Sequence, residues 1–233
     1  MECIFVPELN ESSNEIIISN ERINHLKALR LQTNDQIIFT NGKGLCSVCI
    51  LLSNTKIKYH FKVKTFLKNH GELPYKLGIA LGILSDRNRM EFALEKAVEM
   101  GATDFYPIIT RYSEKRKINF SRLQSKSIAA MEQSKRSCLI HVHQPVCLND
   151  FENIVPDYDT IILAEETGNS PEMTKSLKST ICFVGPEGGF DSDEIEFLKG
   201  LGNSKCWNLG NRRLRTETAA SAILTLVSMK QNQ

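Results

Sequence analysis

Hydrophobic and polar positions in the first seventy residues alternate in short runs. Strands are expected at 16–18, 36–40, 47–52 and 58–66. The last run alternates strictly between polar and apolar side chains, which is typical of a half-buried strand. Asn41-Gly42 between two runs predicts a hairpin turn, because this pair tolerates positive φ. With one helix expected at about 21–29, the pattern favours a small β-barrel.

From Tyr75 onward the pattern becomes an alternation of strands and helices. Expected strands are 77–83, 105–109, 160–164, 181–184 and 206–209, and expected helices are 88–100, 121–136, 195–201 and 216–229. Helix starts are predicted at Asn88, Ser121, Asp191 and Thr216, three of them with Glu or Gln three residues later, as in a capping box. This alternation predicts an α/β domain with helices on both faces of a mostly parallel sheet.

The polar stretch 68–74 contains Gly71 and Pro74 and is the predicted linker. We therefore expect two domains, residues 1–72 and residues 73–233.

Composition indicates a cytoplasmic protein. No apolar run approaches the roughly 20 residues needed to cross a bilayer, and the first residues lack the pattern of a signal peptide. The seven cysteines are odd in number and scattered, which favours reduced thiols.

The net charge of +2 conceals a basic stretch at 111–136, where eight Lys/Arg meet two Asp/Glu. Such a stretch can bind a polyanion, because lysine and arginine displace counterions from phosphates. A solvated loop and helix face explains the same residues, and on charge alone it is the better explanation.

Two connectors carry candidate chemistry. Gly185-Pro186-Glu187-Gly188-Gly189-Phe190 follows an expected buried strand, and in open α/β sheets ligands bind at the carboxyl ends of strands. Leu209-Gly210-Asn211-Arg212-Arg213-Leu214-Arg215-Thr216-Glu217 again joins a strand to a helix. Taken singly, each is also explained as a tight or solvated turn.

Together the two connectors resemble motifs of the ribosomal RNA small subunit methyltransferase E family of the SPOUT superfamily. The resemblance extends to segments 25–30, 41–44, 95–101 and 132–136 and so runs through the whole chain. It departs from the family pattern at Arg213, where an aliphatic residue is usual, at the first residues, and after Leu139.

The resemblance implies a PUA-like β-barrel, binding RNA, followed by a SPOUT domain with a deep trefoil knot. It implies a homodimer that uses S-adenosylmethionine to methylate N3 of one uridine in 16S rRNA of the small ribosomal subunit. The implied cofactor-binding residues are Leu163, Ala164, Glu165, Gly185, Glu187, Gly188, Gly189, Leu209, Gly210, Leu214, Arg215 and Thr216.

Uridine N3 carries a proton that must leave, and the developing charge spreads over the base. Arg215 or Arg136 is therefore a candidate to stabilise that charge, and Glu217 to take the proton or orient the base. The candidate RNA-binding residues are His25, Arg30, Arg111, Lys115, Arg116, Lys117, Arg122, Gln133 and Arg136. RNA contact is expected mostly through phosphates.

No metal and no membrane partner are expected. Cys46 and Cys49 have CxxC spacing but lack a second pair, and on a strand they should point to opposite faces. His141 and His143 share a strand face without an evident third ligand, so surface or RNA-facing roles are expected. A catalytically inactive RNA-binding protein remains the alternative function, and cofactor affinity would discriminate the two. A Rossmann-type methyltransferase is less favoured, since no GxGxG loop follows an early strand.

Overall fold

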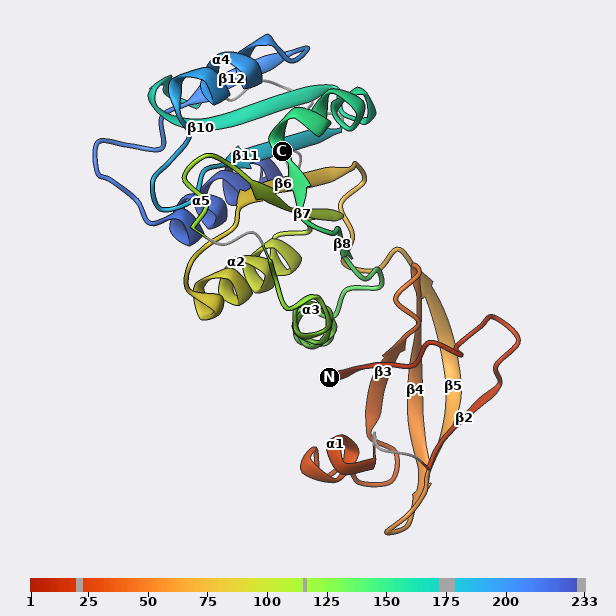
Figure 1. Cartoon of the computed structure of the whole chain (residues 1–233). Helices are drawn as coiled ribbons and strands as arrows, with labels where there is room; N and C mark the ends of the chain where they lie inside the picture. Colours follow the sequence, from red (N-terminus) through yellow and green to blue (C-terminus); the bar gives the residue numbers. More distant parts are fainter. Residues whose placement is uncertain (20–22, 115–116, 172–178, 230–233) are drawn as a thin grey trace. The chain divides into compact units, whose positions relative to one another are not determined.

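Strands of the first seventy residues pair into a curled five-stranded sheet of order β1-β3-β4-β5-β2 (Figure 1). The computed structural model of the chain describes residues 1–19, 23–114, 117–171 and 179–229. The strands are β1 (Cys3–Phe5), β2 (Glu15–Ile18), β3 (Gln36–Thr40), β4 (Leu45–Asn54) and β5 (Tyr59–Lys68). β1 pairs with β3 in parallel, and the other pairs are antiparallel. Two register shifts between β4 and β5 mark irregularities of the kind that bend a sheet.

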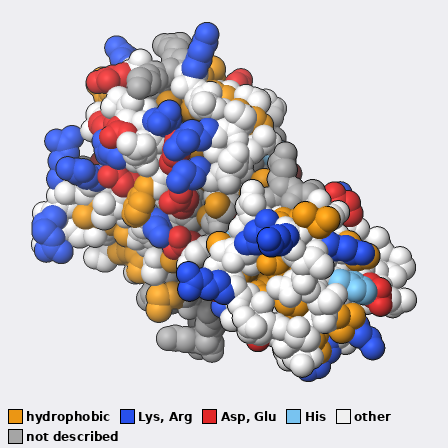
Figure 2. Space-filling view, turned by 90° about the horizontal axis from the view of Figure 1, so that it is seen from below, with side chains coloured by type: hydrophobic (Ala, Val, Ile, Leu, Met, Phe, Trp, Pro, Cys, Tyr) orange, Lys and Arg blue, Asp and Glu red, His pale blue; other side chains and the backbone are white. Residues whose placement is uncertain are grey.

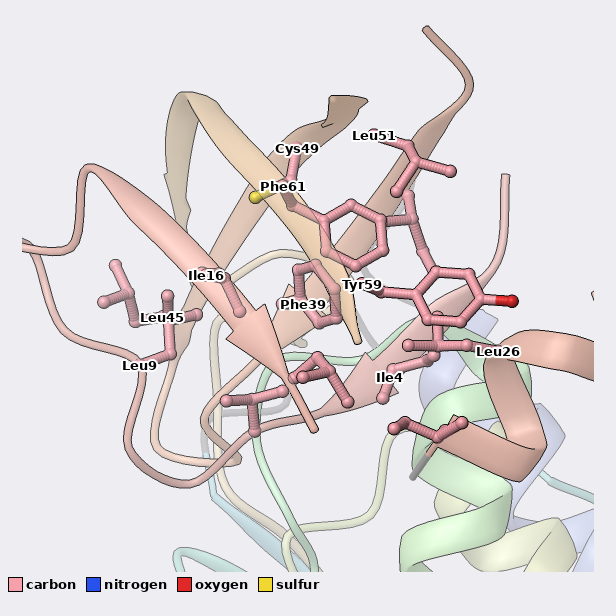
Figure 3. Packing of buried hydrophobic residues seen from close by; sticks show 14 residues of the cluster. Ile4, Leu9, Ile16, Leu26, Phe39, Leu45, Cys49, Leu51, Tyr59 and Phe61 are labelled. Atoms are coloured by element: carbon pink, nitrogen blue, oxygen red, sulfur yellow. The ribbon is translucent and has the colours of Figure 1, made fainter. Parts of the chain in front are cut away.

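Apolar side chains fill the concave side of this sheet (Figure 3). Phe39 and Phe61 lie edge to face with ring centroids 4.9 Å apart, and both are fully buried. Leu26 of α1 (Ile23–Ala28) packs in the same cluster. The predicted helix is thus present from residue 23 onward, while residues 21 and 22 lie outside the described residues.

The CxxC pair behaves as its spacing predicts. Cys46 packs with Cys3 on one side of β4, whereas Cys49 belongs to the core cluster on the other side. Burial raises the pKa of the Cys3 thiol to about 12 and that of Cys49 to about 11. Both thiols are therefore protonated at neutral pH.

Contacts divide the described chain into two units. The first comprises Met1–Glu72 and Met131–Leu139, and the second comprises Leu73–Ala130 and Ile140–Gln233. The segment 131–139, which the sequence assigned to the second domain, joins the first unit through hydrogen bonds. The Ser137 amide donates to the His70 carbonyl and the Leu139 amide to the Gly42 carbonyl.

The second unit is built on a parallel sheet of order β12-β10-β11-β6-β7-β8, with β9 also on β7 (Figure 1). The strands are β6 (Leu77–Gly82), β7 (Asp104–Ile109), β8 (His141–Val142), β9 (Val146–Cys147), β10 (Thr160–Asn169), β11 (Thr180–Val184) and β12 (Ser204–Trp207). Each predicted strand is present, and the two-residue strands β8 and β9 were too short to predict.

Helices cover the parallel sheet on both faces. α2 (Arg87–Glu99) and α5 (Thr216–Met229) pack against each other, and α5 also packs on β11 and β6. The other face is covered by α4 (Ser192–Gly200) and by the 3-10 turns η1 (Leu148–Asn153) and η2 (Val155–Asp157). The remaining helix, α3 (Phe120–Ser134), crosses from the second unit into the first.

Helix starts differ in part from the prediction. Asp191 and Glu194 form the predicted capping box of α4. The predicted cap at Asn88 is wrong: Asp86 caps α2, and its side chain accepts a hydrogen bond from the Asn88 amide. At α3, Asn119 rather than Ser121 accepts the Arg122 amide. In both cases a better-placed Asx acceptor lies two residues upstream of the predicted cap.

Candidate functional site

The loops that leave β6, β11 and β12 meet at the carboxyl edge of the parallel sheet. β6 and β11 are hydrogen-bonded neighbours, which places Ser85 and Glu187 close together. The Glu187 carboxylate accepts hydrogen bonds from the Ser85 hydroxyl at 2.9 Å and the Ser85 amide at 3.2 Å. This contact joins the Gly185–Phe190 loop to the loop that precedes α2.

Arg89 in the first turn of α2 joins the two connectors. Its Nη1 donates to Glu187 Oε1 at 3.0 Å. Its Nε and Nη2 donate to Glu217 Oε2 at 3.0 and 2.7 Å. One guanidinium therefore holds a carboxylate from the loop after β11 and a carboxylate from the start of α5.

The Glu217 carboxylate is held in its ionised form. Burial by itself would raise its pKa, but the hydrogen bond from Arg89 and the charges of Arg89 and Arg215 bring the pKa below its usual value. The side chain is 10% exposed. A carboxylate with a lowered pKa is a weak proton acceptor, so this arrangement suits orientation better than proton removal.

Glycines allow these loops to approach one another closely. A Cβ on Gly82 would lie 2.3 Å from the Pro186 nitrogen, so β6 tolerates no side chain beside this loop. The Pro186 carbonyl accepts the Gly189 amide at 2.9 Å, which closes a tight turn.

Two other glycines face open space. Gly189 has φ +76° and Gly210 has φ +123°, and no atom lies within 4 Å of a Cβ built on either. A positive φ favours glycine, and the missing side chain leaves the backbone accessible to a ligand. Gly210 is further fixed by its amide, which donates to Asn208 Oδ1 at 2.8 Å.

The arginine-rich connector presents its cations to solvent. Arg212, Arg213 and Arg215 are all exposed. Arg213 donates to the Glu187 carbonyl at 3.3 Å, so the residue that departs from the family pattern links the two connectors. Among the described residues, the Arg215 guanidinium has no hydrogen-bond or ion-pair partner, and it is free to meet a ligand.

The remaining predicted cofactor residues line the same edge with different exposure. Ala164, Glu165, Leu209 and Leu214 are half-buried, while Gly185 and Thr216 are buried. Gly188 lies against Tyr112, beside an open hollow of about 390 Å³ between residues 111–114 and 187–188. Leu163 is fully buried in the core, so its side chain cannot contact a ligand.

The predicted RNA-binding residues differ in their solvent exposure. His25, Arg30, Lys117 and Gln133 are exposed, whereas Lys115 and Arg116 lie outside the described residues. Arg111 is exposed but ion-paired with Asp191 at 3.1 Å, and Arg122 is ion-paired with buried Glu91. Figure 2 shows acidic side chains interleaved with basic ones on the visible face of the second unit. The basic stretch is thus partly neutralised.

Arg136 does not have the predicted role. Its side chain is 2% exposed, and its Nη2 lies 2.6 Å from the Glu72 carboxylate. Glu72 also accepts the Ser137 and Cys138 amides at 2.9 and 2.8 Å. The guanidinium is therefore committed to the interior of the first unit and is not available to RNA.

Sequence reasoning missed Arg89, Ser85 and Asn208. The partners of Ser85 and Arg89 lie far away in the sequence, as with Arg89 and Glu217, which are separated by 128 positions. Asn208, in contrast, binds the nearby Gly210 amide. The local signals are the position of Arg89 in the first turn of a helix that follows a buried strand and the close spacing of Asn208 and Gly210.

The segment 71–228 matches the family model described as an RNA methyltransferase domain. The chain belongs to this RNA methyltransferase family. It is 28% identical over 231 residues to the ribosomal RNA small subunit methyltransferase E of Rickettsia conorii. The aligned region covers 95% of this chain and 92% of the relative. The Bacillus subtilis protein of the same name is 29% identical over 235 residues, covering 94% and 91%.

A solved structure of a ribosomal RNA small subunit methyltransferase E from Neisseria gonorrhoeae, bound to S-adenosyl methionine, has the same fold. Its TM-score is 0.87 at 25% identity, with 99% of this chain and 98% of that chain covered. This likeness confirms the predicted fold class, a SPOUT-type α/β methyltransferase domain preceded by a small barrel-like sheet. In the described part of the chain, no helix is long and apolar enough to span a membrane.

Proposed function

We propose that this protein methylates N3 of one uridine in 16S rRNA of the small ribosomal subunit, with S-adenosylmethionine as the methyl donor. The observation that carries the proposal is the likeness, over nearly the whole chain, to an S-adenosyl methionine-bound ribosomal RNA small subunit methyltransferase E. The protein acts, in this proposal, as a homodimer in the cytoplasm, where small ribosomal subunits are its substrate.

The residues at the sheet edge fit the cofactor. Gly189 and Gly210 expose backbone at positive φ with no atom where a side chain would lie. Half-buried Leu209 and Leu214 offer apolar contact, and half-buried Ala164 and Glu165 lie within strand β10, which pairs with β12. S-adenosylmethionine, when bound, supplies a methyl group activated on a sulfonium.

The chain's own part is to position the base and stabilise charge. Arg215 is exposed beside these glycines and is the candidate to stabilise negative charge on the uracil oxygens. Glu217 remains ionised and is oriented by Arg89, so we assign it to holding the base or Arg215 in place. Arg136 is not part of this proposal.

RNA binding is assigned to the exposed basic and polar residues. His25, Arg30 and Gln133 lie in the first unit, and Lys117 and Arg111 in the second. Such residues contact phosphates and position the substrate without reading its sequence. Loss of Arg30, Lys117 or Arg111 should weaken binding moderately and reduce its dependence on salt, since each cation displaces counterions from phosphate.

The test is methyl transfer from labelled S-adenosylmethionine to purified, unmethylated small ribosomal subunits, with identification of the product nucleoside. N3-methyluridine at one position of 16S rRNA is the expected result. Cofactor binding without transfer would point to another RNA substrate. Absence of cofactor binding would overturn the proposal in favour of an inactive RNA-binding protein.

A further inference from the structure

Two histidines of the edge strand β8 and its extension meet a carboxylate of β7 at the amino end of the parallel sheet. Asp104 is the register partner of His141. The His141 amide donates to the Thr103 carbonyl at 2.8 Å and the His143 amide to the Phe105 carbonyl at 2.9 Å. Since side chains two positions apart on a strand share a face, both imidazoles lie on the face that carries Asp104.

The three side chains can supply one ligand atom each within a small volume. Their ligand atoms all lie within 4.8 Å of one another, and His143 Nε2 is 2.9 Å from Asp104 Oδ1. Tetrahedral zinc with bonds of about 2.0–2.1 Å needs ligand atoms separated by roughly 3.3 Å. The His141 side chain is exposed, so a small rotation can bring its ring nitrogen from this range to the separation that zinc needs.

The surroundings orient the ligands. His143 stacks on Tyr106 with ring centroids 3.8 Å apart and on His141 at 4.0 Å. The second oxygen of Asp104 accepts the Thr103 hydroxyl at 2.8 Å. Ligands held by such outer partners lose little conformational freedom on binding a metal. Residues 1–19, 23–114, 117–171 and 179–229 contain only this one group of three His, Cys, Asp or Glu side chains with such spacing.

The charge balance is compatible with a divalent cation. The hydrogen bonds from His143 and Thr103 and the nearby Lys76 hold the pKa of Asp104 below its usual value, although burial opposes this, so the carboxylate is ionised. The Lys76 ammonium is itself directed to Asp157 at 3.5 Å and to the Tyr158 ring at 4.3 Å. Two imidazoles and one carboxylate suit borderline ions such as zinc or cobalt better than magnesium or calcium.

We propose that Asp104, His141 and His143 form a zinc site that fastens β8 to β7. The site lies at the amino end of the strands, whereas the candidate methyl-transfer site lies at their carboxyl end, so the metal takes no part in methyl transfer. Water completes the coordination on the solvent side. The zinc site stabilises the point where the chain re-enters the second unit at Ile140.

The test is zinc titration of the metal-stripped full chain by calorimetry, together with the absorption spectrum of the cobalt-loaded protein. We expect one zinc per chain, a rise in Tm, and a cobalt spectrum without sulfur-to-cobalt charge transfer. His141→Ala should weaken zinc binding at least about tenfold, because loss of an outer partner alone costs that much. This variant should fold, because the His141 side chain is exposed.

His60→Ala is the matched control. His60 also pairs with a carboxylate, Glu15, at 2.8 Å, but that pair is not part of a group of three ligands. Zinc affinity should be unchanged in this variant. Equal affinity of the wild type and His141→Ala would overturn the proposal, as would a thiolate band in the cobalt spectrum. Failure to bind zinc at micromolar concentration would overturn it as well.

Discussion

Two arginine–glutamate clusters in this protein have similar bonds and different surroundings. In the first unit, Glu72 holds Arg136 at 2.6 Å, and the two side chains are 9% and 2% exposed. In the second unit, Glu217 holds Arg89 at 2.7 Å, and the two side chains are 10% and 22% exposed. This pair lies beside glycines that face open space. The first cluster is enclosed by the segments that it joins, and the second borders a site open to ligands.

The difference shows that a strong ion pair does not by itself indicate catalysis. Glu72 also binds two backbone amides, so its partners are all internal to the first unit. Arg89 instead connects two loops of the sheet edge, where exposed Arg215 follows. Both Arg136 and Glu217 are catalytic candidates in the sequence, and their surroundings separate them.

The largest expected effect is on the enclosed cluster. Glu72→Ala removes the partner of a buried guanidinium and of two amides, so we expect a loss of roughly 3–5 kcal/mol in the free energy of unfolding. Urea unfolding measures it. The control is Glu15→Ala, which breaks an exposed pair and should cost about 0–1 kcal/mol. Equal losses in both variants would mean that the enclosed ion pair contributes no more to the free energy of unfolding than the exposed one.

Arg215→Ala should reduce methyl transfer by about 10²–10³-fold while cofactor affinity stays close to wild type. The reason is that Arg215 is the exposed cation placed to meet charge on the substrate base. Single-turnover transfer and calorimetric titration with S-adenosylmethionine measure the two quantities. Arg212→Ala, in the same connector, is the control and should keep most of its activity; a matching loss there would indicate a general effect of charge on RNA binding.

Arg89→Ala should lower kcat by about tenfold or more and change its pH dependence. The variant leaves Glu217 without the cation that lowers its pKa, so that pKa rises. If activity needs the ionised carboxylate, it is then lost at a higher pH as the solution is acidified. Arg89→Lys should recover only part of the activity, since lysine cannot reproduce the fork between two carboxylates. If the acidic side of the pH–activity profile were the same in Arg89→Ala and the wild type, the ionisation of Glu217 would not control the reaction.

The smallest expected effect concerns the glycine turn. Gly189→Ala places a Cβ at φ +76° and in the open space assigned to the cofactor. We expect about tenfold weaker S-adenosylmethionine binding, because the free loop can relax away from the left-handed conformation, which costs about 1–2 kcal/mol, and binding must restore it. Gly200→Ala in α4 is the control, since it also meets open space but has no positive φ. Identical affinity in both variants would place the cofactor elsewhere.

Much of this fold could be predicted from the sequence. Periodicities of two and 3.6 residues are local properties, and they located the long strands and the helices α2, α3, α4 and α5. Elements of two or three residues, such as β1 and β8, were missed because they are too short to show a period. Two helix caps were misplaced because two residues that can cap compete near each start, Asp86 with Asn88 and Asn119 with Ser121.

The sequence by itself identified the two glycine-containing connectors as candidate ligand-binding loops. This was possible because a backbone at positive φ, and a backbone that another segment approaches closely, both favour glycine. Only the tertiary structure decided which side chains meet. It paired Arg89 with Glu217, enclosed Arg136 with Glu72, and placed Asp104 beside His141 and His143. The physical reason is that such contacts join residues from 37 to 128 positions apart (Asp104 to His141 and Arg89 to Glu217), and strand order, not local pattern, brings them together.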